Sequence, residues 1–326
     1  MAEPLVSVIV VNYNGGRYLA RCIGCLQRQT FQDFEAIIVD NGSKDGSFDD
    51  TRKSVQDSRV RFIALGRNVG FAAGNNSAAA QARGKWLALL NPDAFPEPDW
   101  LMELIEATKR HPDVGMFGST QIDANDPTLL DGAGDHYFAA GLPWRGGHRY
   151  PISNLPPEHE AFGPCAAAAM YRTTLFRRLG GFDEHFFCYC EDVDLAFRAR
   201  LVGDRCIQVP GARVHHVGGG IAGARSSFAR YHGARNLIWT FVKNMPSPLF
   251  WILLPLHVAV VSALVIVALF RGDGVAVGRG VRDAVVDLPR VLEARRRVQA
   301  DRTADLTSIG QAMSWNIWYR LRRMPL

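Results

Sequence analysis

The first ninety residues contain four apolar runs separated by segments with helical periodicity, and this alternation constrains the fold more than any other feature of the chain. The runs are rich in Val, Ile and Leu, which is typical of strands buried on both faces. Strands that alternate with helices favour a mainly parallel sheet. We therefore predict an α/β fold with a first helix at residues 17–28 and strands at 5–11, 34–39, 60–65 and 85–90.

Polar loops rich in Asn, Asp and Gly follow the predicted strands. In a parallel sheet, ligands bind outside the carboxyl ends of the strands, where these loops meet. Surface turns would explain each loop singly, but the set as a whole favours a polar ligand that carries phosphate. The loops cover residues 12–16, 40–47, 67–76 and 91–93.

Three acidic residues, Glu191, Asp192 and Asp194, follow the largely apolar run at 186–190. Apolar residues then recur at four-residue spacing, so a helix is expected to begin here. Helix capping is one interpretation, because acids favour the unpaired N–H groups of a first turn. A single acid suffices for a cap, however, and three repel one another, so catalysis is the alternative.

The chain between these two parts shows weaker patterns. Residues 121–164 contain many Gly, Pro, Asp and His residues and are expected to form a long irregular segment, which in a compact domain is either functional or disordered. Ordered structure is expected again at 163–179. A further strand is predicted at 205–209, ahead of the sequence GARVHHVGGG.

Charge and cysteine content exclude several classes of protein. The net charge of +5 comes entirely from residues 271–326, which hold 11 basic and 6 acidic residues, so no nucleic-acid partner is expected. The six cysteines are expected to be ordinary buried thiols of a reducing compartment. The C-x-x-C formed by Cys22 and Cys25 lacks the second pair that a zinc site would need. No signal peptide is apparent at the start, which predicts a cytosolic catalytic part.

Residues 249–270 form an apolar stretch of 22 residues without a formal charge. This stretch is long enough to cross a bilayer, and a buried core helix is the alternative interpretation.

Six short motifs occur in order along residues 6–245, which is about three quarters of the chain. Together they resemble family 2 glycosyltransferases of the GT-A fold, and most closely the rhamnosyltransferase-like members that build bacterial cell-surface polysaccharides. Each motif is weak alone, and the ordered set is specific. The motifs are VSVIVVNYNGGRYLARCI, VDNGSKDGS, NVGFAAGNN, LLNPDA, GFDEHFFCYCEDVDLAFR and VHHVGGG.

The resemblance implies a Rossmann-like GT-A domain over residues 1–245 and a helical membrane-associating tail over 246–326. It also implies an inverting transfer, in which a sugar moves from a nucleotide diphosphate donor to a hydroxyl of a glycan acceptor with the help of Mg²⁺ or Mn²⁺. A dTDP- or UDP-sugar is the expected donor, with rhamnose favoured.

For the donor, the resemblance points to the ends of the first two strands. Asn12 and Tyr13 would contact the nucleotide, and the Tyr13 ring could stack on a pyrimidine. Asp40 would accept a hydrogen bond from the base, although a role in a local turn is the alternative. The candidates for pairing with the phosphates are Arg67, Arg225 and Arg235.

For the metal, Asn91-Pro92-Asp93 stands where the family has D-x-D. Asp93 would be a hard oxygen ligand, whereas Asn91 departs from the acidic pattern and would contact substrate; a plain turn is the alternative. His216 would be a second ligand and would favour Mn²⁺ somewhat, with His215 competing for the role and a purely structural histidine as the alternative. Glycines 218–220 would let the backbone approach the diphosphate.

For the acceptor, the resemblance makes Asp192 the general base that removes the proton of the attacking hydroxyl. Glu191 would shape the acceptor or sugar pocket. Asp194 would cap the helix or pair with Arg198 four residues later. The three acids would thus have different tasks.

A single span at 249–270 would carry the basic tail outward, against the positive-inside tendency. Pro255 and His257 also interrupt the apolar stretch. We therefore expect peripheral or monotopic attachment to the cytoplasmic face of the membrane, with a single span as the alternative. Such attachment suits a polyprenyl-linked acceptor. The arginines expected to face anionic head groups are Arg295, Arg296 and Arg297.

Three other classes of protein fit less well. A nucleotidyltransferase would need a basic loop with Lys after the first strand, and NYNGGRYLAR contains no Lys. A catalytically silent membrane adaptor would be expected to lose Asp93 or Asp192, and both are present. An NAD-dependent dehydrogenase would need G-x-G-x-x-G after the first strand, which is absent.

Overall fold

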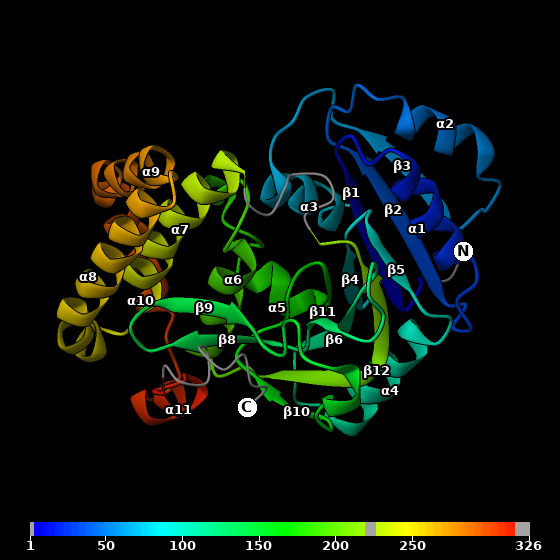
Figure 1. Cartoon of the computed structure of the whole chain (residues 1–326). Helices are drawn as coiled ribbons and strands as arrows, with labels where there is room; N and C mark the ends of the chain where they lie inside the picture. Colours follow the sequence, from blue (N-terminus) through cyan, green and yellow to red (C-terminus); the bar gives the residue numbers. More distant parts are fainter. Residues whose placement is uncertain (1–2, 219–225, 317–326) are drawn as a thin grey trace.

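The computed structural model describes residues 3–218 and 226–316, and it shows a large central sheet with helices on both faces (Figure 1). The described strands are β1 (Val6–Asn12), β2 (Phe34–Asp40), β3 (Val60–Ala64), β4 (Trp86–Leu90), β5 (Ala94–Pro96), β6 (Met116–Asp123), β7 (Leu130–Gly132), β8 (Asp135–Phe138), β9 (Leu142–Arg145), β10 (His159–Ala161), β11 (Ala168–Arg172) and β12 (Cys206–His216).

The α-helices of the described residues are α1 (Arg17–Gln27), α2 (Ser47–Ser54), α3 (Phe71–Ala79), α4 (Trp100–Arg110), α5 (Thr173–Arg178), α6 (Glu191–Leu201), α7 (Ser227–Asn244), α8 (Ser247–Phe270), α9 (Gly274–Val286), α10 (Leu288–Ala300) and α11 (Leu306–Ala312). Two 3-10 turns, η1 (Ile152–Asn154) and η2 (Glu184–Phe186), complete the described helical segments.

The main sheet is mixed, and its four strands from the first ninety residues are parallel to one another. Among the described residues its order is β10-β12-β6-β11-β4-β1-β2-β3, with β5 paired to β12 and β7 paired to β6. Strands β4, β1, β2 and β3 run parallel, whereas β11 is antiparallel to both of its neighbours. The order reverses at β1, because β2 and β4 lie on its two sides, and such a reversal opens a crevice for ligands at the carboxyl ends.

Alternate residues of the buried strand β1 face two separate apolar layers. Val8 and Val10 belong to the layer that includes residues of α1 and α4, whereas Ile9 and Val11 belong to the layer that includes residues of α3 and α6. Because side chains alternate across a strand, a run of apolar residues is needed where both faces are covered. The predicted α/β fold and its first four strands are confirmed.

One prediction about the middle of the chain is wrong, and another is confirmed but too short. The segment 121–164 is not irregular, because it contains the end of β6 and the short strands β7, β8, β9 and β10. The strand predicted at 205–209 continues to His216, with a change of register between Val209 and Arg213. This irregularity lets β12 pair with β6 along both halves, and it places His216 at the end of a strand.

Tail helices α8, α9 and α10 lie together beside α7, at the end of the molecule away from α1 and α2, whereas α11 lies apart from them (Figure 1). The tail then returns to the rest of the chain: the backbone N–H of Thr303 donates to Leu201 O at 3.0 Å, and that of Ser314 donates to Tyr137 O at 2.9 Å. The division into domains at residue 245 therefore stays a prediction, since residues on both sides of it share these contacts.

Arg295 does not face lipid, contrary to the prediction. Its guanidinium is buried and donates hydrogen bonds to Val242 O, at 2.7 Å, and to Met245 O. These carbonyls lie at the C-terminal end of α7, where the helix leaves its last acceptors unpaired. Arg296 and Arg297 are exposed.

Candidate active site

The ends of β1 and β2 meet at the crevice and hold the residues expected to bind the donor. Asn12 lies opposite Asp40 in the parallel register. The buried Asn12 amide donates to Ser43 Oγ at 3.0 Å and to Ser47 Oγ at 3.1 Å, while its Oδ1 atom has no partner among the described residues. The loop after β2 is therefore tied over the end of β1.

The other donor candidates border the same two loops. Asp40 is buried and accepts from the backbone N–H of Ser43 at 3.3 Å, which is the turn role that had been the alternative for it. Tyr13 is 39% exposed. The backbone of Arg67 packs against Gly42, where an added Cβ would lie 2.6 Å from the Arg67 carbonyl carbon. The Arg67 side chain is exposed and pairs with no described residue.

Of the other two phosphate candidates, one is not described and one is engaged elsewhere in the protein. Arg225 and glycines 219 and 220 lie outside the described residues. Arg235 belongs to α7, and its guanidinium donates to the carbonyls of His185, at 3.2 Å, and Phe186, at 3.1 Å. It also lies over the ring of Trp239, so Arg235 is engaged by the protein itself.

The proposed metal ligands Asp93 and His216 are brought together by pairing of β5 with β12. His216 lies opposite Ala94 in this pair, and both proposed ligands are buried. The His216 Nε2 atom lies 3.4 Å from Asp93 Oδ1 and makes no hydrogen bond to any described residue. A buried imidazole nitrogen that faces a carboxylate oxygen in this way is a donor set that suits a divalent cation.

Asp131 supports His216 from the opposite side of the imidazole ring, a contact that the sequence analysis missed. His216 Nδ1 donates to Asp131 Oδ2 at 2.7 Å, so Nε2 is the nitrogen turned toward Asp93. This carboxylate–histidine arrangement is common behind metal-binding histidines. Burial alone would raise the pKa of Asp131, but Arg145 and the two histidines that contact it hold the pKa well below its usual range.

The other metal-site candidates are placed differently. His215 is partly exposed, and its Nε2 atom lies 3.2 Å from Glu97 Oε1, so of the two histidines His216 is the one beside Asp93. Asn91 forms the turn after β4: its backbone N–H donates to Ala167 O at 2.9 Å, and its carbonyl accepts from Ala94 N at 3.0 Å. The Cys22 thiol also donates to this carbonyl at 3.6 Å, so the helix that carries the C-x-x-C supports the turn.

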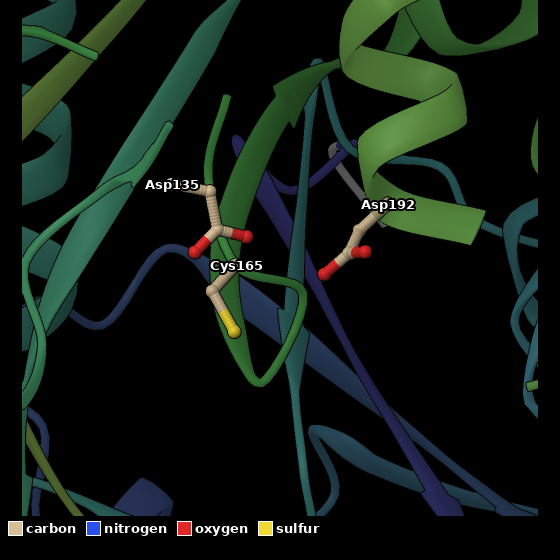
Figure 2. A group of neighbouring side chains, drawn as sticks. All are labelled: Asp135, Cys165 and Asp192. Carbon is tan, nitrogen blue, oxygen red and sulfur yellow. The ribbon is translucent and has the colours of Figure 1, made fainter. Parts of the chain in front are cut away.

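Asp192 lies at the start of α6 and faces Asp135 and Cys165, which come from β8 and from the loop before β11 (Figure 2). One atom of each of these three side chains lies within 4.8 Å of the other two. The backbone N–H groups of Ala166 and Val193 donate to the Asp192 carboxylate at 3.0 and 2.8 Å. Two backbone donors therefore fix the orientation of this side chain.

Burial raises the pKa of Asp192, and the two backbone hydrogen bonds and the charge of Arg145 offset this only in part. Burial raises the pKa of Asp135 to about 8, and the neighbouring Asp192 adds to the effect. Burial also raises the pKa of the Cys165 thiol to about 12. This part of the site therefore gathers acids in an environment that disfavours their charge.

The three acids of the motif have different surroundings. Glu191 is buried, its Oε2 atom has no partner among the described residues, and its pKa is raised well above its usual range by burial and by Asp192. Asp194 is fully buried and accepts from Arg198 Nε at 2.8 Å, which confirms the predicted pair, and also from Lys243. Asp194 is therefore part of the packing between α6 and α7.

A chain of charged contacts connects the metal-site candidates to Asp192. Asp93 faces His216, His216 bonds to Asp131, and Asp131 forms an ion pair with Arg145. The positive charge of Arg145 in turn offsets part of the rise in the pKa of Asp135 and of Asp192. Asp93 and Asp192, which lie about a hundred residues apart in the sequence, thus belong to one electrostatic network.

Asp131, Asp135 and Arg145 all come from the segment that had been expected to be irregular. The acids that flank Gly-Ala-Gly at residues 131–135, just before an apolar pair in β8, are the one sequence signal that could have drawn attention to them. Acids beside small residues are common in turns, so this signal is weak on its own.

A mostly parallel sheet flanked by helices, with polar strand ends, an Asp–His pair at one of them and a carboxylate on a facing helix, is typical of the GT-A fold. Residues 7–180, more than half of the chain, match the model of the family described as Glycosyl transferase family 2, and the chain belongs to this family.

Relatives agree with this assignment. The N-acetylglucosaminyl-diphospho-decaprenol L-rhamnosyltransferase of Mycobacterium tuberculosis is 29% identical over 238 residues, which cover 65% of this chain and 76% of that protein. The putative glycosyltransferase EpsH of Bacillus subtilis is 32% identical over 150 residues, 43% of each chain.

Solved structures agree in fold. The mannosyltransferase PcManGT of Pyrobaculum calidifontis, in complex with GDP-Man and Mn²⁺, superposes with a TM-score of 0.56 at 19% identity and covers 95% of this chain and 87% of its own. GalNAc-T7 with UDP, GalNAc and Mn²⁺ gives a TM-score of 0.60 at 16% identity over 74% of this chain. The match spans only 48% of the GalNAc-T7 chain.

Proposed function

We propose that this chain is an inverting glycosyltransferase that moves a hexose, with rhamnose favoured, from a dTDP- or UDP-linked donor to a hydroxyl of a polyprenyl-linked glycan in the synthesis of cell-surface polysaccharide. The mycobacterial relative supports the sugar and the lipid-linked acceptor, because its name contains both. The observation that carries the proposal is the charged network that runs from Asp93 and His216 through Asp131 and Arg145 to Asp192.

Asp192 is the proposed general base. Its carboxylate is oriented by the backbone N–H groups of Ala166 and Val193, and its raised pKa makes it a stronger base than an exposed aspartate. As the acceptor hydroxyl attacks the sugar, its proton passes to an Asp192 oxygen. Because the hydroxyl attacks directly, the reaction inverts the anomeric centre and needs no nucleophile from the protein.

The donor would lie along the strand ends. Asn12, Tyr13 and Asp40 are proposed to contact the nucleoside, and the free guanidinium of Arg67 to pair with a phosphate. Glu191 and Asn91 are proposed to line the sugar pocket. Asp93 and His216 would hold Mg²⁺ or Mn²⁺, and the bound cation would neutralise charge on the departing diphosphate.

A screen of nucleotide sugars tests this function. The purified chain is incubated with each sugar nucleotide, with and without Mn²⁺ or Mg²⁺, and released nucleoside diphosphate is measured in the presence of a polyprenyl-diphosphate-linked acceptor. We expect metal-dependent release with one donor and its loss in Asp192→Asn. A catalytically silent adaptor would release no diphosphate, and a nucleotidyltransferase would instead form pyrophosphate from a nucleoside triphosphate and a sugar phosphate.

We also propose that α8 lies along the cytoplasmic leaflet rather than across the bilayer. Among the described residues it is the one helix long and apolar enough to span a membrane, and Trp251, Ile252 and Phe270 on it are 69%, 70% and 89% exposed. Its middle is held by the catalytic part, since His257 Nδ1 donates to Ala140 O at 2.8 Å. The return of the tail to Leu201 and Tyr137 also favours attachment to one side of the membrane.

Protease treatment of intact, right-side-out cells separates in-plane attachment from a single span. An epitope at the end of the tail should stay protected in intact cells and become cleavable only after lysis. Cleavage in intact cells would show that the tail is outside and would exclude the in-plane arrangement.

A further inference from the structure

The segment 186–190, directly before Glu191 and Asp192, has an unusual backbone. Phe187, Tyr189 and Cys190 have φ angles of 63°, 72° and 65°, a region that residues other than glycine seldom occupy. Such a conformation persists only where the surrounding structure imposes it. Because α6 begins at Glu191, this backbone sets the position from which Asp192 points into the site.

Asn236 of α7 forms hydrogen bonds to the backbone of this segment. Asn236 is fully buried, and its side-chain amide lies 3.0 Å from Phe186 O, 2.9 Å from Cys188 O and 2.7 Å from Tyr189 O, donating to these carbonyls. Its own Oδ1 atom accepts from Arg235 Nε at 2.9 Å, and Arg235 donates in turn to Phe186 O. The NH2 group of one side chain thus lies within hydrogen-bond distance of three carbonyls of a strained segment.

Among residues 186–189, the one carbonyl that Asn236 does not bind is that of Phe187, and it is held from the side of α3. Phe187 O accepts from the backbone N–H of Phe71 at 2.7 Å and of Ala72 at 3.3 Å, at the N-terminus of α3. The carbonyls of residues 186–189 are therefore all engaged, by α7 on one side and by α3 on the other. Because all four carbonyls are already bonded, the backbone of residues 186–189 cannot move without breaking hydrogen bonds.

We propose that Asn236 is a positioning residue for the transfer reaction, which holds segment 186–190 in its strained backbone conformation and thereby fixes Asp192 in the site. The inference rests on the proposed function, because it assigns Asn236 a role through Asp192. Asn236 itself touches neither the metal-site candidates nor the strand ends. Removing its amide takes the side-chain donor from Cys188 O and Tyr189 O, whereas Phe186 O keeps its bonds to Arg235 and to the Cys188 N–H. The segment is then held less firmly, so Asp192 loses its fixed orientation.

Asn236→Ala is the test, and Asn244→Ala is its matched control. Asn244 is an equally buried carboxamide two turns further along α7, where it donates to Asp194 Oδ1 at 2.8 Å and makes no bond to segment 186–190. Both variants lose a buried amide, so both are expected to unfold at lower temperature. Only Asn236→Ala should lower kcat, by about 100-fold, because small displacements of a catalytic group have effects of this size.

Three measurements are made on the full-length chain: kcat and KM for nucleoside diphosphate release, the Kd of the nucleoside diphosphate with Mn²⁺, and amide hydrogen exchange over 186–192. In Asn236→Ala we expect lower kcat, faster exchange in this segment, and KM and Kd within about twofold of wild type, because the donor contacts are elsewhere. If Asn236→Ala does not fold, Asn236→Ser, which keeps one donor, is used with the same expectations at smaller amplitude.

Two results would overturn the inference. Unchanged exchange over 186–192 would show that Asn236 does not hold the segment, and an equal fall of kcat in Asn244→Ala would show a general loss of packing. Failure of the proposed function has a different signature, since the wild-type chain would then release no nucleoside diphosphate, or Asp192→Asn would keep its transfer rate.

Discussion

The ends of β1 and β2, which we call the donor edge because the donor is proposed to bind there, differ from the region around Asp192 in the kind of side chain that they hold. At the donor edge, neutral groups such as Asn12, Ser43 and Ser47 bond to one another at the ends of β1 and β2. Around Asp192, burial raises the pKa of Asp135, Glu191 and Asp192, and the charge of Arg145 offsets part of this rise for Asp135 and Asp192. The first arrangement suits recognition of a polar ligand. In the second, burial disfavours the charged form of the carboxyl groups, which makes them stronger bases for proton transfer.

The largest effect is expected from Asp192→Asn. Loss of a general base typically lowers the rate by about 10² to 10⁴-fold. The donor edge is untouched by this change, so the Kd of the nucleoside diphosphate, measured by calorimetry, should stay at its wild-type value. A variant that keeps near wild-type transfer would show that the acids serve only the packing of α6.

The next effect tests whether the two regions are connected through the metal-site candidates. Asp131→Asn removes the carboxylate behind His216 without removing either proposed ligand. Changes to such supporting groups typically weaken metal binding about 10 to 100-fold. Mn²⁺ affinity can be followed by the loss of the free-ion electron paramagnetic resonance signal.

His215→Ala is the matched control for Asp131→Asn, because His215 lies beside Glu97 and not beside Asp93. It should leave Mn²⁺ affinity unchanged. Equal weakening in both variants would contradict the assignment of His216, and no weakening in Asp131→Asn would remove Asp131 from the metal site.

The positions of the polar residues at the strand ends could be predicted from sequence, because each depends only on its neighbours in the chain. Asn12 and Asp40 directly follow apolar runs, Asp93 follows another run after the two turn residues Asn91 and Pro92, and a parallel sheet brings such ends to one edge. The helix that begins at Glu191 was predicted for the same reason, since its apolar spacing and its acids lie next to each other in the chain.

The residues between these regions could not be predicted, because their positions depend on pairing that is distant in sequence. Strands β7 and β8 have only 3 and 4 residues, too few for a clear alternation of polar and apolar side chains. The roles of Asp131 and Arg145 depend on their contacts with His216 and with each other, and these contacts form only because β12 places His216 beside Asp131. Arg295 was misplaced similarly, because the unpaired carbonyls that it binds belong to α7, about fifty residues earlier.

A smaller effect is expected from pH, through Asp135. An aspartate whose pKa is raised to about 8 in the folded protein keeps its proton there, while the unfolded chain loses it near the usual value of 3.8. Stability therefore falls as pH rises between about 4 and 8, because over this range the folded state binds the extra proton. Asp135→Asn should flatten this fall and raise the free energy of unfolding at pH 9 by about 1–2 kcal/mol.

Urea unfolding of wild type and Asp135→Asn at pH 5 and pH 9 measures this difference. The variant should gain little at the lower pH and most at the higher one. A gain of the same size at both values would attribute the effect to packing instead of to the proton.

The smallest effect is expected at the exposed rim of the donor edge. Tyr13 is 39% exposed, so a base that stacks on its ring would gain only part of the usual stacking energy, about 0.5–1 kcal/mol. Tyr13→Ala should therefore raise KM for the donor about two- to fivefold and leave kcat unchanged, because stacking on the base is the same before and during transfer. Tyr13→Phe keeps the ring and should behave as wild type. A fall in kcat with unchanged KM would place Tyr13 near the reacting sugar, and the contrast between a recognition edge and a reactive region would then fail at this residue.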